Sequence, residues 1–537
     1  MAVYIHYFEN QEAFEPVYNG SGYIEPWVSY TEGRGLDYNK TEDEKLIGTP
    51  FTIEALGSGN ITWALGDKTV QYSKNGGSWE TMNSATSISV VEGDEVQFKG
   101  NNSGYSYFDE SQWGYIGNNL NSTVDCNVYG NIMSLTDGDN FENADTVNEY
   151  AFYFLFCDYW EQGGFRVVNA KNLKLPATTL ANYCYAYMFQ GCTGLTTAPE
   201  LPATTLASSC YTNMFSNCTS LTAAPELPAT TLTDYCYYSM FYNCTNLTTA
   251  PALPATTLAN ACYCMMFMSC GNLTTAPELP ATALTPYCYS NMFYGCTSLT
   301  QVSELPATTL ATSCYNSMFA NCASLTTVPE LPATTLASSC YRVMFDGCTS
   351  LTTAPELPAT TLTDFCYYMM FRGCTGITTA PELPATALTP YCYMYMFYGC
   401  TSLTAAPELS ATTLASSCYT YMFTNCTSLT TAPELPATTL ATGCYAYMFQ
   451  GCTGLTTAPA LPATTLVSNC YNYMFSGCTS LNYIKAMFTT TPSTSYTRSW
   501  VSRVASSGTF VKNASASWTT TGANGIPTGW TVQTATS

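Results

Sequence analysis

One hexapeptide, repeated at a constant interval, limits what this chain can fold into. The segment Leu-Pro-Ala-Thr-Thr-Leu, or a close variant, begins at twelve leucines that lie 26 residues apart, from Leu175 to Leu461. A unit of this length cannot bury an apolar face by itself, so neighbouring units are expected to stack around a shared core. The sequence therefore predicts a solenoid of twelve 26-residue coils over residues 175–486.

Inside each unit, the apolar spacing favours a helix. In the unit 201–226 the apolar side chains follow the pattern i, i+1, i+4, i+5, i+8 at Cys210, Tyr211, Met214, Phe215 and Cys218. Thr-Pro or Thr-Asp where this segment begins is typical of a helix N-cap, as at 285–286 and 233–234. Gly, Asn or Ser before the second cysteine suits a left-handed residue at a helix end. A run such as 221–225, ended by proline, predicts a short strand. The predicted fold class is α/β, a leucine-rich-repeat-like solenoid of short strand plus helix.

Cysteine follows the repeat. Of 27 cysteines, 24 occur as two per unit, and the others are Cys126, Cys157 and Cys264. We expect two buried columns of free thiols, in which cysteine acts as a small apolar residue. A disulfide framework is the alternative, but dense disulfides are typical of small secreted domains. The recurring Cys-x7-Cys spacing is not a zinc motif, so no metal site is expected.

A column of glutamates should line one edge of the solenoid. Its nine members recur at one position of the unit: Glu200, Glu226, Glu278, Glu304, Glu330, Glu356, Glu382, Glu408 and Glu434. A solvated edge that limits aggregation is the favoured interpretation, and calcium binding is the alternative. Leu-Pro-Ala-Thr also resembles a sortase signal, but its fifth residue is Thr or Ala and it is internal, so we interpret it as structural.

The units keep Met-Phe-x-x-Cys and mostly continue with Thr-x-Leu, in an unchanged 26-residue frame. This pattern resembles the bacterial surface protein 26-residue repeats and the BspA-like leucine-rich repeats. The resemblance covers about three fifths of the chain. It departs from the commoner, shorter BspA-like unit by the extra Ala-Pro-Glu-Leu-Pro stretch. It implies a leucine-rich-repeat fold and a bacterial cell-surface adhesin.

Differences between units concentrate at four positions of the expected helix, illustrated by Tyr235, Tyr238, Ser239 and Tyr242. These positions carry Phe365, the charged residues Arg342, Asp346 and Arg372, many small polar residues, and fourteen tyrosines. Tyr, Ser and Asn are also the residues that antibody paratopes use, and aromatic rings stack on sugar faces. We predict that this helical face, or the Thr-rich strand face beside it, is a ligand-binding surface; the alternative is that positions free of packing constraints have drifted. The candidate residues are Tyr183, Tyr187, Tyr235, Tyr238, Tyr242, Tyr287, Tyr294, Tyr368, Tyr391, Tyr395, Tyr398, Tyr421, Tyr447 and Tyr473.

Four segments of the chain lie outside the repeats and differ from them in sequence pattern. Residues 1–45 are interpreted as an extended N-terminal attachment segment, and 46–145 as a β-sandwich module with a hairpin at Asn75-Gly-Gly. Residues 146–174 resemble a degenerate repeat that caps the solenoid entrance, and 487–537 should form a C-terminal cap. With an ending of the form Asn-Gly-Ile-Pro-x-Gly-Trp at 524–530, this layout is similar to repeat proteins of phages that infect gut Bacteroidales.

Composition narrows the function. With 15 Lys+Arg against 37 Asp+Glu the net charge is −22, so the counterion release that drives nucleic-acid binding is missing. His6 is the single histidine, so His-based catalytic triads and most zinc or haem sites lack the residues they need. We therefore expect no enzymatic activity, no catalytic residues, no bound metal and no cofactor. An Asp/Glu hydrolase in the N-terminal half stays possible, but no spacing singles out a pair. No apolar run approaches the length of a membrane helix, and the first residues lack a signal-peptide pattern, so a soluble protein without Sec export or membrane insertion is expected.

Three functions follow from these observations. The first is a non-enzymatic phage tail or head fibre on the virion surface, exposed outside the cell after release. It would recognise a host-surface glycan or protein and contact other virion proteins through its N-terminal region. The second is a bacterial cell-surface adhesin, and the third is a structural spacer without a ligand. Oligomerisation is left open.

Overall fold

The computed structural model describes residues 41–109, 114–117, 120–157 and 165–535. The chain divides into two compact units, Met1–Lys45 and Leu46–Ser537. Most of the predicted attachment segment, residues 1–40, lies outside the described residues. Its acidic end is helical rather than extended, because α1 (Glu42–Ile47) begins there. The first turn is closed by a capping box, in which the Glu44 N–H donates to Thr41 Oγ1 at 3.2 Å and the Thr41 N–H donates to Glu44 Oε2 at 2.6 Å.

Two β-sheets, in which most neighbouring strands are antiparallel, build the core of the N-terminal module. The larger sheet has the order β11-β10-β1-β6-β3-β4, and a smaller one has the order β5-β2-β9. Trp63 of β2 packs edge-on against Phe98 of β6, with ring centroids 5.6 Å apart, so the two sheets share one core. The strands are β1 (Thr52–Ala55), β2 (Gly59–Trp63), β3 (Val70–Lys74), β4 (Glu80–Met82), β5 (Ser87–Val90), β6 (Glu95–Gly100), β7 (Ser106–Asp109), β8 (Gly114–Gly117), β9 (Leu120–Ser122) and β10 (Cys126–Asn131).

The larger sheet leads directly into the repeats. After α2 (Ser134–Asp137) and a 3₁₀ helix (Gly138–Asn143), strands β11 (Val167–Asn169) and β12 (Leu173–Lys174) pair with β10 in parallel. The sheet continues with a single parallel β-bridge between Asn169 of β11 and Thr197 of the first repeat. The module and the solenoid are therefore joined by backbone hydrogen bonding.

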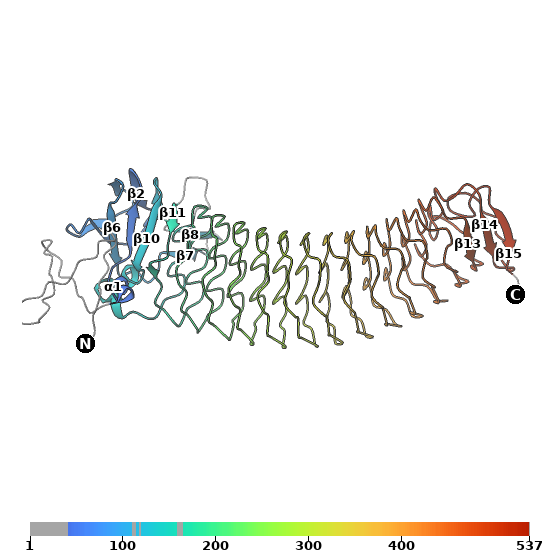
Figure 1. The fold of residues 1–537 in the computed structure, drawn as a ribbon, viewed down its shortest axis with the longest axis horizontal. Helices are drawn as coiled ribbons and strands as arrows, with labels where there is room; N and C mark the ends of the chain where they lie inside the picture. Colours follow the sequence, from blue (N-terminus) through green and yellow to red (C-terminus); the bar gives the residue numbers. More distant parts are fainter. Residues whose placement is uncertain (1–40, 110–113, 118–119, 158–164, 536–537) are drawn as a thin grey trace, which may run out of the picture. The chain divides into compact units, whose positions relative to one another are not determined.

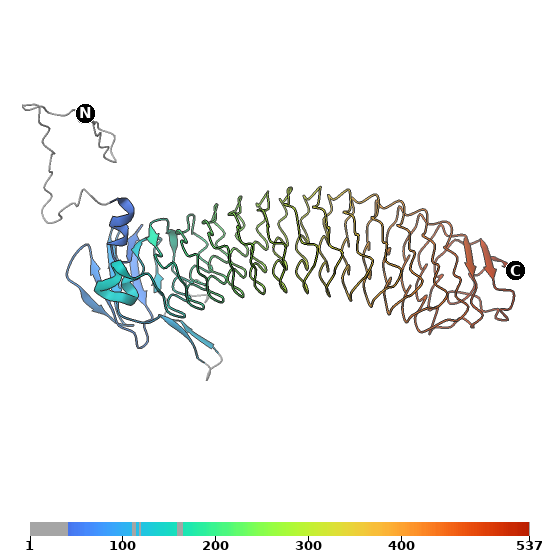
Figure 2. The ribbon, with the colours of Figure 1, turned by 90° about the horizontal axis from the view of Figure 1, so that it is seen from below.

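The predicted helix of each unit is wrong. The segment that follows each Leu-Pro-Ala-Thr-Thr-Leu consists of consecutive turns, and Figures 1 and 2 show coils of this kind in one row between β11 and β13. In the unit 227–252, the N–H of Tyr238 donates to the carbonyl of Tyr235, three residues back, while the N–H of Tyr237 donates to Cys262 in the next coil. Every second N–H thus leaves the coil, whereas a helix would keep them all within it.

The expected N-cap is wrong for the same reason. The Thr285 hydroxyl donates to the carbonyl of Ala259 in the preceding coil, 2.7 Å away, instead of accepting from a following N–H. The side chain therefore joins two coils rather than starting a helix.

Every fourth residue of the turn segment has a left-handed backbone. In the unit 227–252 these are Tyr235 (φ 58°), Ser239 (φ 51°) and Asn243 (φ 57°), and the same three positions have positive φ in the other units. The third of them is the Gly, Asn or Ser before the second cysteine, for which the left-handed prediction is confirmed. The first two also carry Tyr, Met, Phe and Val343 (φ 61°), residues that ordinarily avoid this region.

The core consists of columns that run from coil to coil. Tyrosine rings stack from Tyr185 to Tyr471 at 5.7 to 6.0 Å, and phenylalanine rings stack from Phe189 to Phe475 at 5.5 to 5.8 Å. Leu201, Ala203 and their equivalents are buried beside them, so the structural interpretation of Leu-Pro-Ala-Thr is confirmed. All 27 cysteines are buried free thiols, as expected.

The predicted short strands are reduced to single parallel bridges, such as Ala223 to Thr249 and Thr353 to Thr379. Beyond the repeats, ordinary strands return as a parallel sheet of β13 (Tyr483–Ala486), β14 (Thr509–Lys512) and β15 (Thr531–Thr534).

The turn pattern also extends past the repeats at both ends. Before the repeats, the backbone N–H of Phe152 donates to the carbonyl of Cys184. After the last repeat, the backbone N–H of Phe475 donates to the carbonyl of Trp500, and the ring centroids of these two residues lie 6.1 Å apart.

Candidate binding surface

The four variable positions of each unit lie on the turn segments, where their tyrosines are partly or fully exposed and several small residues, such as Ala186 and Ala320, are buried. We call this surface, formed by the residues equivalent to Tyr235, Tyr238, Ser239 and Tyr242, the turn face. Twelve of the fourteen candidate tyrosines are partly exposed there, and Tyr235 and Tyr287 are exposed, at 46% and 48%. The tyrosines thus lie outside the core as predicted, but on turns rather than on a helix, and they do not meet in one cavity.

In the first five coils, tyrosine alternates with small residues at the first turn-face position. Tyr183, Tyr235 and Tyr287 occupy alternate coils, and Ser209 and Ala261, both 4% exposed, lie between them. Tyr183 stacks on Tyr150 of the entrance segment, with 4.9 Å between centroids and 4° between planes. Tyr235 instead makes an edge-type ring contact with Tyr238 of its own coil, with 5.9 Å between centroids.

In the last four coils, tyrosines of neighbouring coils stack instead. Tyr395, Tyr421, Tyr447 and Tyr473 form a ladder with centroids 4.4, 4.2 and 4.6 Å apart and nearly parallel planes. The inner rings cover one another, so this ladder presents ring edges and hydroxyl groups. The expected stacking of sugars on ring faces therefore does not suit these four residues.

Between these regions lie the charged residues of the turn face. Arg372 forms a bidentate pair with Asp346 of the preceding coil, at 2.8 Å from Nε to Oδ1 and 2.6 Å from Nη2 to Oδ2. The guanidinium of Arg342 lies over the ring of Tyr368, 5.3 Å from its centroid. Phe365 and Tyr391 stack nearby at 4.7 Å.

Partial burial raises the pKa of several of these tyrosines. Desolvation raises the pKa of Tyr238, and it raises the pKa of Tyr395 and Tyr421, which also lie beside other phenol groups. These side chains are neutral hydrogen-bond donors at physiological pH.

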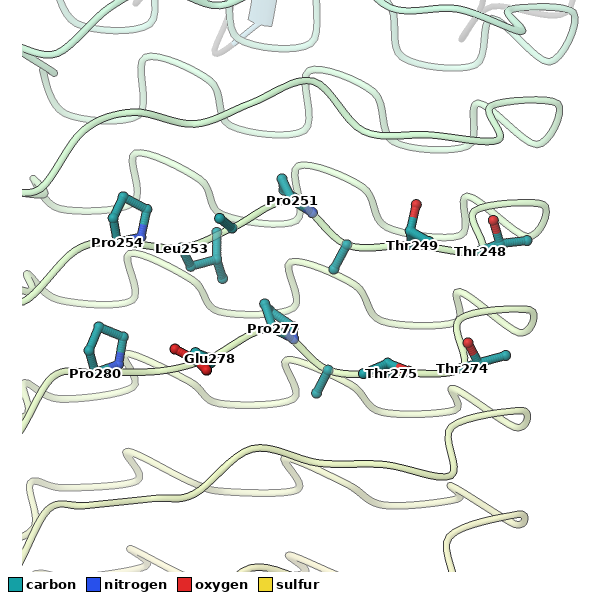
Figure 3. A pocket seen from close by; sticks show the side chains of 13 residues that line it. Thr248, Thr249, Pro251, Leu253, Pro254, Thr274, Thr275, Pro277, Glu278 and Pro280 are labelled. Atoms are coloured by element: carbon teal, nitrogen blue, oxygen red, sulfur yellow. The ribbon is translucent and has the colours of Figure 1, made fainter.

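A groove lies apart from the turn face, over a different part of the coils. It has a volume of about 530 Å³, and Figure 3 shows its lining from two neighbouring coil segments, 248–254 and 274–280. Thr248, Thr249, Pro251 and Pro277 line it, and Glu278 is its charged residue. It opens where Ala252 replaces the glutamate of the edge column. Its polar lining consists of threonine hydroxyls and this one carboxylate.

The glutamate column is exposed at all nine positions. Lys174 approaches Glu200, with 3.6 Å between Nζ and Oε2. Within the described part of the chain, no group of three or more His, Cys, Asp or Glu side chains is placed to hold a metal ion. No helix in that part is both long and apolar enough to cross a membrane.

The repeats place the protein in a known family. A family model described as "BspA type Leucine rich repeat region (6 copies)" matches residues 159–275, 262–404 and 370–498. The chain belongs to the BspA-type leucine-rich repeat family. Proteins of this family are typically non-enzymatic binding scaffolds, and they are usually found at a surface or outside the cell. The resemblance expected from Met-Phe-x-x-Cys is thereby confirmed.

Other comparisons add little to this BspA-type assignment. No curated protein matches the sequence. One solved structure, titled "Crystal structure of TLR13-ssRNA13 complex", matches at 15% identity, with 68% of this chain and 45% of that chain covered. The chain thus spans less than half of that structure's chain. Its TM-score is 0.22, and so this likeness carries no argument about fold or ligand.

Sequence reasoning on this BspA-type chain missed the small residues between the exposed tyrosines. The count of tyrosines identified the exposed rings, but it did not identify Ser209 and Ala261, the small residues that separate these tyrosines along the solenoid. Comparing one position across successive units would have found the alternation.

Proposed function

We propose that this protein is a non-enzymatic binding protein of a phage particle, a tail or head fibre, that recognises a host-surface glycan or protein with its turn face. The observation that carries the proposal is a variable, nearly uncharged, tyrosine-rich surface on a constant core. Tyrosine gives a large contact area at a low entropy cost, and it is enriched where binding energy concentrates. The virion location rests on the similarity of the layout to phage repeat proteins.

The contrast between core and turn face supports recognition over a mere spacer. The core columns repeat the same Tyr, Met, Phe and Cys in coil after coil, whereas the equivalents of Tyr235 include Ser209, Ala261, Phe365 and Gly443. A spacer needs the first feature only. The N-terminal region would attach the fibre to other virion proteins.

A bacterial cell-surface adhesin is the second candidate, because BspA-type proteins are usually found at a surface. Immunogold electron microscopy on a culture that makes the protein separates the two locations. Gold on phage heads or tails supports the fibre, whereas gold on the cell envelope alone supports the adhesin and contradicts the virion location.

The binding role is tested with the purified full chain. We expect it to bind host cells, and a variant with Ser at Tyr235, Tyr238 and Tyr242 to bind less at an unchanged melting temperature. Equal binding by this variant would contradict a role for this part of the turn face. No binding by the wild type to either cells or particles would favour the spacer.

A further inference from the structure

The charged residues are unevenly distributed along this chain. All 37 acidic residues lie within residues 1–434, and Glu434 is the last of them. Residues 435–537 contain four basic residues, Lys485, Arg498, Arg503 and Lys512, and no aspartate or glutamate. The net charge of −22 therefore arises before residue 435, and the C-terminal part of the chain is cationic.

The basic residues are also separated in space from the glutamate column. Two complete coils, 435–460 and 461–486, lie between Glu434 and the coil that carries Arg498 and Arg503. Core rings of successive coils are 5.6 and 5.8 Å apart in this region. The separation along the solenoid therefore exceeds the Debye length of about 8 Å at physiological ionic strength. An anion beside the arginines is thus screened from the acidic part of the protein.

Two of the four basic side chains are available to a ligand. Lys512 donates its ammonium group to two backbone carbonyls, at 3.1 and 3.0 Å, and lies over the ring of Trp518. Lys485 is half-buried on β13. Arg498 and Arg503 are exposed, and within the described residues neither guanidinium has a carboxylate partner.

Arg498 continues the turn face beyond the repeats. The N–H of Asn213 donates to the carbonyl of Tyr238, 25 residues later, and the N–H of Tyr473 donates to that of Arg498 at the same interval. Arg498 thus takes the place of Tyr238. Its own N–H donates to Asn472 Oδ1 at 2.8 Å. The backbone of Arg498 is therefore held by two hydrogen bonds, while its guanidinium stays exposed.

Arg503 has a left-handed backbone, with φ 61°. The N–H of Gly477 donates to the carbonyl of Ser502, so Arg503 takes the place of Gly477, where all twelve units have Gly, Asn or Ser. This conformation is unfavourable for a long side chain such as arginine. Residues held in unfavourable conformations cluster at functional sites. The backbone of Arg503 therefore indicates a role beyond folding.

The chemistry of this end suits an acidic sugar. Arginine presents its N–H donors in a planar fork that matches oxyanions such as carboxylate. Tyr447 and Tyr473, the last rings of the tyrosine ladder, precede the arginines and offer hydroxyl groups that donate and accept hydrogen bonds. A sugar that carries an acid group presents several hydroxyls beside it, whereas an acidic peptide side chain does not. The combination therefore favours a glycan over a peptide.

We propose that the C-terminal end of the turn face, with Arg498 and Arg503, binds the carboxylate or sulfate groups of an acidic host-surface glycan. This inference rests on the proposed binding function and names its ligand chemistry. It also orients the protein, because an anionic surface attracts the cationic C-terminal end and repels the acidic remainder.

The test removes both charges from the full chain. The variant is Arg498→Gln, Arg503→Asn, and its fold should persist because Asn217, Asn243, Asn321 and Asn425 have φ between 57° and 62° at the place of Arg503. The matched control, Arg166→Gln, Lys171→Asn, removes two exposed basic side chains near the entrance of the solenoid. The probes are a uronate oligosaccharide, a sulfated oligosaccharide and a neutral one of equal length, with binding measured by calorimetry.

We expect the wild type to bind at least one acidic oligosaccharide about tenfold or more tighter than the neutral one. The preferred probe distinguishes carboxylate from sulfate, and the affinity should fall as salt is added. The double variant should lose about tenfold or more in affinity, and the control should lose none.

Equal binding of the acidic probes by the double variant and the wild type would overturn the proposal. So would binding of a glutamate-rich peptide without binding of either acidic oligosaccharide. If no probe binds while the wild type still binds host cells, the glycan inference fails and the binding function stands. If the wild type binds neither probes nor cells, both fail.

Discussion

The thiol of Cys244 donates to the backbone carbonyl of Phe215 in the preceding coil, with 3.1 Å between sulfur and oxygen. The contact recurs along the solenoid, from Cys218 with Phe189 at 3.1 Å to Cys478 with Phe449 at 2.9 Å. One column of cysteines therefore both fills the core and links each coil to its neighbour.

Thiol reactivity tests this arrangement. Burial raises the pKa of Cys270 and of Cys348 to about 12, so the reactive thiolate is rare in the folded chain. At about pH 8, near the pKa of an ordinary cysteine, we expect almost no reaction of the native protein with a chromogenic disulfide reagent. Unfolding in guanidinium should release the full set of 27 thiols. Rapid reaction of a large share before unfolding would contradict the buried columns.

Stability should fall in alkali. Burial raises the pKa of Cys288 from 9.0 to about 11 and that of Cys340 from 9.0 to about 12. The folded chain thus keeps protons that the unfolded chain loses, so this stability is complete below the ordinary pKa and disappears as the pH rises through the folded pKa. Each such thiol contributes about 1.4 kcal/mol per pH unit in that window. Melting curves should shift sharply downward above pH 9.0; constant melting temperatures up to pH 11 would contradict the prediction.

The phenylalanine column should be sensitive to truncation. Phe241 lies 5.6 Å from both Phe215 and Phe267 and is fully buried. Phe241→Ala should lower the free energy of unfolding by about 3 to 5 kcal/mol, because it leaves a cavity. Tyr242→Ala, at the adjacent turn-face position, is the control and should change it little. Denaturant titration of both variants measures the difference, and similar costs would contradict the assignment of core and surface.

Backbone strain at Val343 should be relievable. This β-branched residue has φ 61°, whereas Asn213 and Asn291 have φ 53° and 55° at the same turn position. Asn tolerates the left-handed region, which costs most other residues about 1 to 2 kcal/mol. Val343→Asn should therefore raise the melting temperature, and the reverse change Asn213→Val should lower it. A higher melting temperature for Asn213→Val would show that packing, not backbone conformation, decides this position.

The core was predictable from the sequence because its pattern does not depend on the type of turn. Cys210, Tyr211, Met214, Phe215 and Cys218 are buried as expected. A four-residue turn repeat and a helix place the same side chains inward over nine residues. Their difference lies in where the N–H groups go, and the 3.6-residue pattern carries no information about bonds to the next coil. The scarcity of strong helix formers in these segments was the available warning.

The turn face was predictable in composition but not in arrangement. The variation between units identified all fourteen candidate tyrosines of the turn face. Whether two rings stack, as Tyr421 and Tyr447 do, or stand apart, as Tyr235 and Tyr287 do, depends on which residue occupies the same position in the neighbouring coil. That relation becomes visible only when the coils are aligned in register.

The most direct test of the account compares host-cell binding by the full-length wild type and by the double variant Tyr235→Ser, Tyr287→Ser, with Glu330→Ser, at an exposed position of the glutamate column outside the turn face, as the control. Both altered tyrosines are exposed, so the melting temperature of the double variant should match that of the wild type. The account predicts a loss of about tenfold or more in affinity for the double variant and near wild-type binding by the control. Undiminished binding by a folded double variant would contradict recognition through the tyrosines of the turn face.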